Sequence, residues 1–261
     1  MISWVDRFAR FGYMCQGTVF ILIGILAFMA AAGVGGDTEN TTGALHSLAK
    51  FPFGQFLLFA IGTGLIGFIM LMCLKTFKDI DRNGTAVGGL VQRGSHLLSA
   101  GIYTFVSVQA FRIAMSQNTN SEYSESTVSS YLLAQPFGAI VVVIIGLIII
   151  ATGLFQVYSG LKERHMDGFK VYEMTPKEQH FAAITGKIGF SARGIIFVII
   201  GYFFTITAIR SNPDEAQGFD DALATLQDQP FGGLWLGIVA VGVIAFGIYA
   251  FVRAHYEHIR L

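Results

Sequence analysis

Six long stretches of the chain consist almost entirely of apolar residues, with short polar segments between them. They cover residues 12–34, 54–75, 92–115, 138–160, 188–209 and 231–254. A helix needs about 20 apolar residues to cross ~30 Å of hydrocarbon. In lipid every backbone polar group also needs an internal partner. The pattern therefore predicts an all-α integral membrane protein with six transmembrane helices.

A short string recurs directly before the second, fourth and sixth stretches. Its three copies are Pro52-Phe53-Gly54, Pro136-Phe137-Gly138 and Pro230-Phe231-Gly232. A glycine also lies at a nearly constant distance ahead of each copy, at Gly17, Gly101 and Gly194. Proline fixes φ and lacks an N–H, so it suits the first turn of a helix. We therefore expect each string to begin a membrane helix, with its phenylalanine at the membrane interface.

The repeated strings divide the chain into three units. A fixed internal period defines the structural unit of a repeat protein, and here the unit is about 85 to 95 residues long. We expect three tandem helical hairpins over residues 1–80, 88–165 and 182–258, arranged with pseudo-three-fold symmetry. The segments ahead of the strings, residues 42–49, 129–134 and 220–226, are predicted to be short helices in the outer interface.

Charge changes the picture only by giving the chain an orientation. Charged residues make up 13% of the chain, about half the ~25% of soluble proteins. The net charge is zero, so nothing suggests a nucleic-acid partner. On the side of the Pro-Phe-Gly strings we place only Lys50, Arg112 and Arg210, and nearly all other Lys and Arg lie opposite. The positive-inside rule then predicts that both termini are cytoplasmic.

The first repeat resembles a known family. The residues that carry the likeness are Arg10-Phe11-Gly12-Tyr13, Gly17, Phe20, Gly24, Gly43-Ala44-Leu45 and Pro52-Phe53-Gly54. They look like the bacterial membrane family catalogued as domain of unknown function 1206. The likeness covers nearly the whole chain. It implies three tandem two-helix repeats in the bacterial cytoplasmic (inner) membrane, and it carries no activity.

The second repeat departs from this pattern. The third repeat keeps Gly189-Phe190, Gly194, Phe197 and Gly201. In the second repeat, His96 occupies the position of the early glycine and Val108 replaces the later one. The likeness to the family is therefore weakest in the helix that contains His96.

Of the six stretches, the third contains the most polar residues. His96, Ser99 and Tyr103 lie on it with Gln92 and Ser95, largely at intervals of four residues that share one helix face. An ionisable residue within a membrane helix is by default a functional hypothesis, and histidine titrates near neutral pH. The alternative is that His96 lies near the cytoplasmic interface and bonds to a neighbouring helix.

Arg193 is the second candidate, since it falls inside the fifth stretch. Its counterparts in the other repeats are Gln16 and Ala100. Arginine at mid-membrane costs about 2.5–3.5 kcal/mol on insertion scales. Arg193 either extends to the inner surface or faces the bundle axis with a partner. Gln156, near the end of the fourth stretch, is a weaker candidate.

Two classes of function remain open. No pattern of catalytic, cofactor-binding or metal-ligating residues is recognisable, so we expect no enzyme, no cofactor and no metal. One hypothesis is a membrane scaffold, or a protein that binds lipid or a small molecule, with membrane lipids and another membrane protein as the expected partners. The other is a transporter or channel with a polar cavity along the pseudo-three-fold axis. Gln16, His96, Ser99, Tyr103, Gln156 and Arg193 are the candidate ligand or cavity-lining residues.

Overall fold

The computed structural model describes residues 4–34, 41–80, 84, 87–115, 137–210 and 230–257. The long helices are α1 (Trp4–Ala31), α3 (Gly54–Phe77), α4 (Val87–Met115), α6 (Gly138–Leu161), α7 (Pro176–Arg210) and α9 (Gly232–Tyr256). The short helices are α2 (Thr41–Ala49), η1 (Arg164–Met166) and η2 (Val171–Glu173). Within the described residues, extended pairing is limited to an isolated bridge between Phe169 and Glu257.

The six long helices confirm the predicted number of membrane spans, because each is long and apolar enough to cross a membrane. The first helix of each repeat begins earlier than expected, at Trp4, Val87 and Pro176. The hydropathy pattern marks only the lipid-immersed part, whereas these helices continue into polar sequence. At α7 the Thr175 hydroxyl accepts from the Glu178 N–H, and the Glu178 carboxylate accepts from the Thr175 N–H. This capping box explains the early start of α7.

The Pro-Phe-Gly strings begin α3, α6 and α9 as predicted, with a different role for the proline. The helices start at the glycines, and the preceding phenylalanines adopt the left-handed conformation with φ of 65°, 64° and 62°. These phenylalanines are exposed, in keeping with an interfacial position. Pro52 and Pro230 lie in the turn before the helix, so the prediction that the proline occupies the first helical turn is wrong for these two copies. Pro136 lies outside the described residues.

A short helix before the first string is also confirmed. Helix α2 (Thr41–Ala49) matches the expected segment 42–49, and Leu45 and Leu48 on it are buried in the core. A Cβ on Gly54 would collide with the backbone carbonyl of Leu48, so this position requires glycine. The corresponding segments 129–134 and 220–226 lie outside the described residues.

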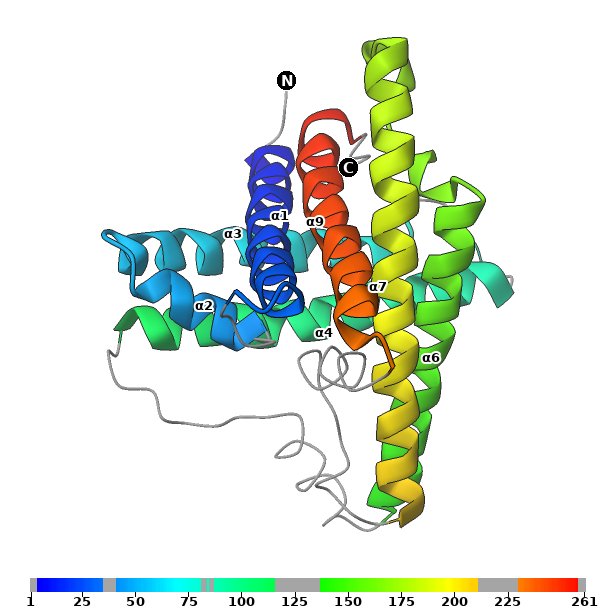
Figure 1. Cartoon of the computed structure of the whole chain (residues 1–261). Coiled ribbons are helices and arrows are strands. Elements are labelled where there is room, and N and C mark those ends of the chain that lie inside the picture. The colour runs from blue at the N-terminus through cyan, green and yellow to red at the C-terminus, as the bar shows by residue number, and fades with distance from the viewer. Residues whose placement is uncertain are drawn as a thin grey trace.

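The most extensive helix packing joins different repeats. The three closest pairs are α1 with α9, α3 with α4, and α6 with α7. In every pair the second helix of one repeat lies against the first helix of another, so the three repeats form a closed cycle. The α3–α4 pair lies across the α6–α7 pair, so the pairs cross one another instead of forming a parallel bundle (Figure 1). The N- and C-terminal ends of the described chain lie close together at one end of α1 and α9 (Figure 1).

Glycines allow the close approach in two of these pairs. A Cβ on Gly17 would lie 2.8 Å from the Gly247 carbonyl oxygen, and one on Gly247 would lie 2.7 Å from that of Gly17. Gly153 and Gly194 show the same reciprocal contact between α6 and α7, at 2.7 and 2.6 Å. Small residues of this kind drive helix association in lipid, where apolar burial contributes little.

Within each repeat the two helices pack less closely, and α4 with α6 least of all. In repeat 1 a Cβ on Gly12 would lie 2.6 Å from the Phe68 backbone nitrogen. In repeat 3 one on Gly189 would lie 2.5 Å from the Phe246 Cα. The equivalent residue of repeat 2 is His96, whose side chain cannot fit such a contact. The departure seen in the sequence therefore coincides with the most loosely packed of the three pairs of long helices within a repeat.

Candidate functional site

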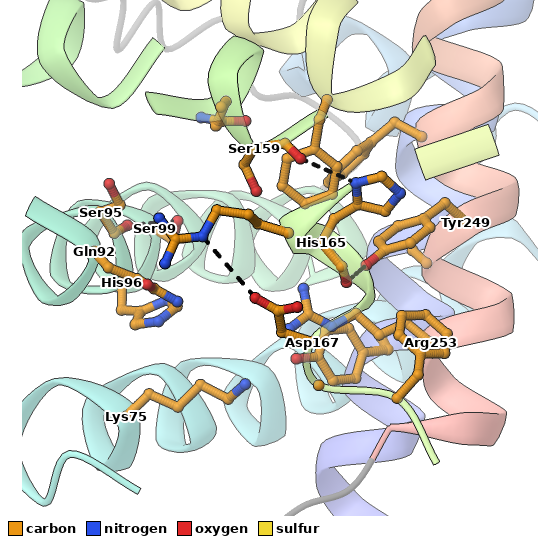
Figure 2. Close-up of a pocket in the computed structure, with 18 of the residues that line it drawn as sticks. Lys75, Gln92, Ser95, His96, Ser99, Ser159, His165, Asp167, Tyr249 and Arg253 are labelled. Carbon is orange, nitrogen blue, oxygen red and sulfur yellow. Dashed lines mark hydrogen bonds and ion pairs between the residues drawn. The ribbon is translucent and has the colours of Figure 1, made fainter. Parts of the chain in front are cut away.

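A cavity of about 420 Å³ lies beside the loosely packed α4–α6 pair. Its walls come from the end of the molecule where α1 and α4 begin and where α3, α6 and α9 end, together with α7 and the η1–η2 segment. Figure 2 shows the polar side chains of α4, Gln92, Ser95, His96 and Ser99, across the cavity from Tyr249 and Arg253 of α9. The cavity is therefore lined by the parts of the helices that lie toward the two chain termini.

Five of the six residues singled out from the sequence line this cavity. They are Gln16, His96, Ser99, Gln156 and Arg193. Tyr103 is buried next to it, and its hydroxyl accepts a hydrogen bond of 2.5 Å from the Gln16 carboxamide nitrogen. The structure thus brings together polar residues from all three repeats, as the triplicate alignment of Gln16 with Arg193 suggested.

Arg193 is buried in the bundle, and its side chain does not reach the surface. It is only 6% exposed, and its Cζ lies 4.7–5.3 Å from the ring centroids of Phe20, Phe197 and Phe246. Its Nε has no hydrogen-bond acceptor, and no carboxylate among the described residues forms an ion pair with it. Of the two alternatives left open by the sequence, extension of Arg193 to the inner surface is therefore wrong, because the side chain lies among three aromatic rings inside the bundle. The other alternative, a site facing the bundle axis with a partner, has no ion-pair partner among the described residues.

Arg193 differs in this respect from the other basic residues around the cavity. Lys75 and Arg253 both pair with Glu257, Arg164 with Asp167, and Lys170 with Glu173. Gln156, like Arg193, has a buried polar atom without a hydrogen-bond partner among the described residues, which is its carboxamide oxygen. Among the described residues, the cavity therefore has a buried cation, Arg193, without a counter-ion and a buried acceptor, Gln156, without a donor.

Glu257 organises the wall next to α1, and the sequence analysis missed it. Its carboxylate lies 2.6 Å from the Lys75 Nζ, binds the Arg253 guanidinium, and accepts a hydrogen bond of 3.1 Å from the Tyr13 hydroxyl. Burial opposes the charged form, but Arg253 and Lys75 together lower the pKa of Glu257. The only signal in the sequence was an acidic residue just beyond a membrane helix, and its partner Lys75 is 182 positions away.

The segment after α6 covers the cavity and is fixed at both ends. The His165 ring bonds the carbonyl oxygens of Ser159 and Ala183, each at 3.2 Å. The Tyr249 hydroxyl donates to the His165 carbonyl (Figure 2). The Lys170 N–H donates to the Tyr256 carbonyl. Burial lowers the pKa of His165. This segment therefore forms a cover that is hydrogen-bonded to α6, α7 and α9.

The cavity lining offers groups that can bind a ligand. Among the described residues, no group of three or more His, Cys, Asp or Glu side chains is placed to hold a metal ion. The lining combines hydroxyl, carboxamide and basic groups with aromatic rings, a composition typical of small-molecule sites. The charge balance around Arg193 favours a negatively charged ligand.

Comparison with known proteins identifies the family. Residues 11–79, 95–163 and 188–257 each match the Domain of Unknown Function (DUF1206) family. The chain belongs to the DUF1206 family. It is also 41% identical over 255 residues to the "Uncharacterized protein YxxB" of Bacillus subtilis (strain 168), covering 98% of this chain and 92% of that protein. No solved structure matches the chain. The three matched segments confirm the three tandem repeats and the resemblance seen in the sequence.

Proposed function

We propose that this DUF1206 protein is a ligand-binding protein of the membrane and that the cavity beside α4 and α6 is its binding site. The observation that carries the proposal is the convergence of polar side chains from all three repeats on one cavity of about 420 Å³. A scaffold needs no such cavity, and buried polar groups without partners cost free energy. Binding a ligand gives those groups a role. No catalytic step is assigned to them.

The cavity favours binding over a continuous pore. Its lining residues lie toward one end of the helices. Farther along the same helices from the lining residues, equivalent positions of the three repeats are occupied by Tyr103, Val19 and Ile196. These side chains are at most 3% exposed. All three belong to one hydrophobic core cluster, and we propose that they close the centre of the bundle. The site is therefore proposed to exchange its ligand with one side of the membrane.

Cysteine accessibility tests the proposal. In a Cys15→Ser/Cys73→Ser background, Ser99→Cys places a thiol in the cavity lining, whereas Ser107→Cys places one on the same helix at a buried site that bonds the Gly62 carbonyl. We expect a membrane-impermeant thiol reagent to label residue 99 at least tenfold faster than residue 107. Equal, slow labelling of both thiols would mean a packed interior and would overturn the proposal in favour of a scaffold.

We further propose that the protein lies in the bacterial cytoplasmic membrane with both termini in the cytoplasm. The distribution of Lys and Arg supports this orientation. The Arg10 guanidinium binds the carbonyls of Ala254 and Glu257, which supports placing both terminal regions on the same side. The Ser99→Cys thiol should then react in inverted vesicles and stay unreacted in right-side-out vesicles. The opposite result would reverse the orientation.

A further inference from the structure

We propose that the ligand of this cavity is an organic anion that also bears a hydroxyl group, held by Arg193 and Gln156. A phosphate ester or a carboxylate next to a hydroxyl has this chemistry. It can come from the head group of a lipid or from a free metabolite. The inference rests on the proposed function and names the class of ligand that the site takes.

The negative charge of the proposed ligand is inferred from the environment of Arg193. A buried ion without a counter-ion carries a large desolvation cost, and a cation–π contact is weak compared with that cost. The rings of Phe20, Phe197 and Phe246 therefore offset only part of that cost. The other described basic residues of the lining already have carboxylate partners. An anion at the Arg193 Nε supplies the missing acceptor as a charge-assisted hydrogen bond.

The hydroxyl group of the proposed ligand is inferred from the environment of Gln156. This residue is 7% exposed, and its carboxamide oxygen has no donor. A fully deprotonated anion offers only acceptors, so it satisfies Arg193 and leaves Gln156 without a partner. A hydroxyl on the same ligand donates to the carboxamide oxygen. Together the two residues require one acceptor with negative charge and one donor.

The residues that line the cavity favour a lipid head group as the source of the anion. Phe68, Phe155 and Phe246 line the cavity with aromatic surface, which suits the apolar part of an amphiphile. The cavity also adjoins α4 and α6, the least closely packed of the long-helix pairs within a repeat. On α4, a Cβ at Gly94 or Gly101 would contact nothing within 4 Å. An acyl chain has the most room to leave the bundle along this flank.

Three probes with related head groups separate the sources. The purified full-length protein is titrated in a neutral maltoside detergent with glycerol 1-phosphate, lauroyl lysophosphatidylglycerol and lauroyl lysophosphatidylcholine, with the thermal unfolding midpoint and Kd as readouts. We expect the phosphatidylglycerol probe to bind at least tenfold more tightly than the phosphatidylcholine probe, which shares the hydroxyl of the glycerol backbone but has no hydroxyl beyond the phosphate and no net charge. Comparable binding of glycerol 1-phosphate and the phosphatidylglycerol probe identifies a free anion as the source; binding of the lipid alone identifies the membrane.

Two variants test the residues. Arg193→Gln should weaken binding of the preferred anion roughly tenfold or more, as expected for loss of a charged hydrogen bond. Without ligand, its unfolding midpoint should equal or exceed that of the wild type, since the variant removes an uncompensated charge. Lys187→Gln is the matched control, because Lys187 is an exposed cation on the same helix as Arg193 and does not line the cavity. It should bind like the wild type.

Failure of the inference differs from failure of the proposed function. If no anion binds more tightly than the phosphatidylcholine probe, or if Arg193→Gln binds the anion like the wild type, the inference is overturned. A lowered midpoint of Arg193→Gln with unchanged anion binding would assign Arg193 to packing alone. In each of these cases, rapid labelling of the Ser99→Cys thiol would keep the cavity as a binding site for another class of ligand.

Discussion

Glu257 shows how one side chain joins three of the long helices. It follows α9, and its partners Lys75 and Tyr13 belong to α3 and α1. The side chain is almost fully buried, and its carboxylate also binds Arg253. Removal of one partner from a buried ion pair is costly because it leaves the other charge uncompensated. Glu257 therefore contributes to the closure of the repeat cycle, where repeat 3 meets repeat 1.

We predict that Glu257→Gln lowers the free energy of unfolding by about 3–5 kcal/mol near neutral pH. Because the folded pKa of Glu257 is depressed, the stabilisation is present above the unfolded value of about 4.3 and is lost as the pH falls through the folded pKa. Unfolding of the purified protein at pH 7 and below pH 4 should show this acid dependence in the wild type and a smaller one in the variant.

Glu173→Gln is the matched control for this prediction. The Glu173 carboxylate is 45% exposed and lies 3.2 Å from the Lys170 Nζ. Exposed ion pairs contribute about 0–1 kcal/mol, so this variant should unfold much like the wild type. Equal losses in the two variants would contradict the role of burial at Glu257.

At the scale of helices, equivalent positions of the repeats have different environments. Gly17 and Gly101 occupy the same place in repeats 1 and 2. Gly17 contacts the Gly247 backbone, whereas a Cβ at Gly101 would meet nothing within 4 Å. The sequence showed that both positions are glycine, but it could not show which of them is in contact. Contact depends on the partner helix, which belongs to another repeat.

We predict opposite results from the same substitution at these two positions. Gly17→Ala places its Cβ 2.8 Å from the Gly247 carbonyl oxygen, so overpacking should destabilise the protein by about 1–3 kcal/mol. Gly101→Ala should be neutral or stabilise by up to about 1 kcal/mol, because alanine is the better helix former. Unfolding of both variants in mixed micelles measures the difference, and similar losses would argue against the α1–α9 contact.

At the scale of the molecule, the sequence predicted the elements better than their partners. The number of spans, the repeats and the start of α3, α6 and α9 follow from hydropathy and from the Pro-Phe-Gly strings, which are local signals. The cyclic pairing, the aromatic cage around Arg193 and the ion pair of Lys75 with Glu257 depend on residues far apart in the chain. Polarity alone still identified five residues of the cavity lining, because polar side chains in membrane helices avoid lipid.

The last prediction concerns the origin of the cavity. In repeats 1 and 3, Gly12 and Gly189 of the first helix lie against the second helix, and repeat 2 has His96 at this position. On the second helix, repeats 1 and 3 have Gly64 and Gly242, and repeat 2 has Ile148 at this position. His96→Gly/Ile148→Gly restores both glycines. We expect α4 to approach α6, the cavity to shrink, and labelling of the Ser99→Cys thiol to fall at least fivefold.

His96→Ala/Ile148→Gly is the control for this variant. It also lacks the imidazole, but it keeps a Cβ, and at Gly12 or Gly189 a Cβ would lie within 2.6 Å of the facing backbone. In the control the helices should therefore stay apart, and labelling at residue 99 should remain rapid. If both variants label at the same rate, the cavity does not depend on the missing glycine. If only the glycine variant loses labelling, the loss of helix contact in repeat 2 is what opened the site.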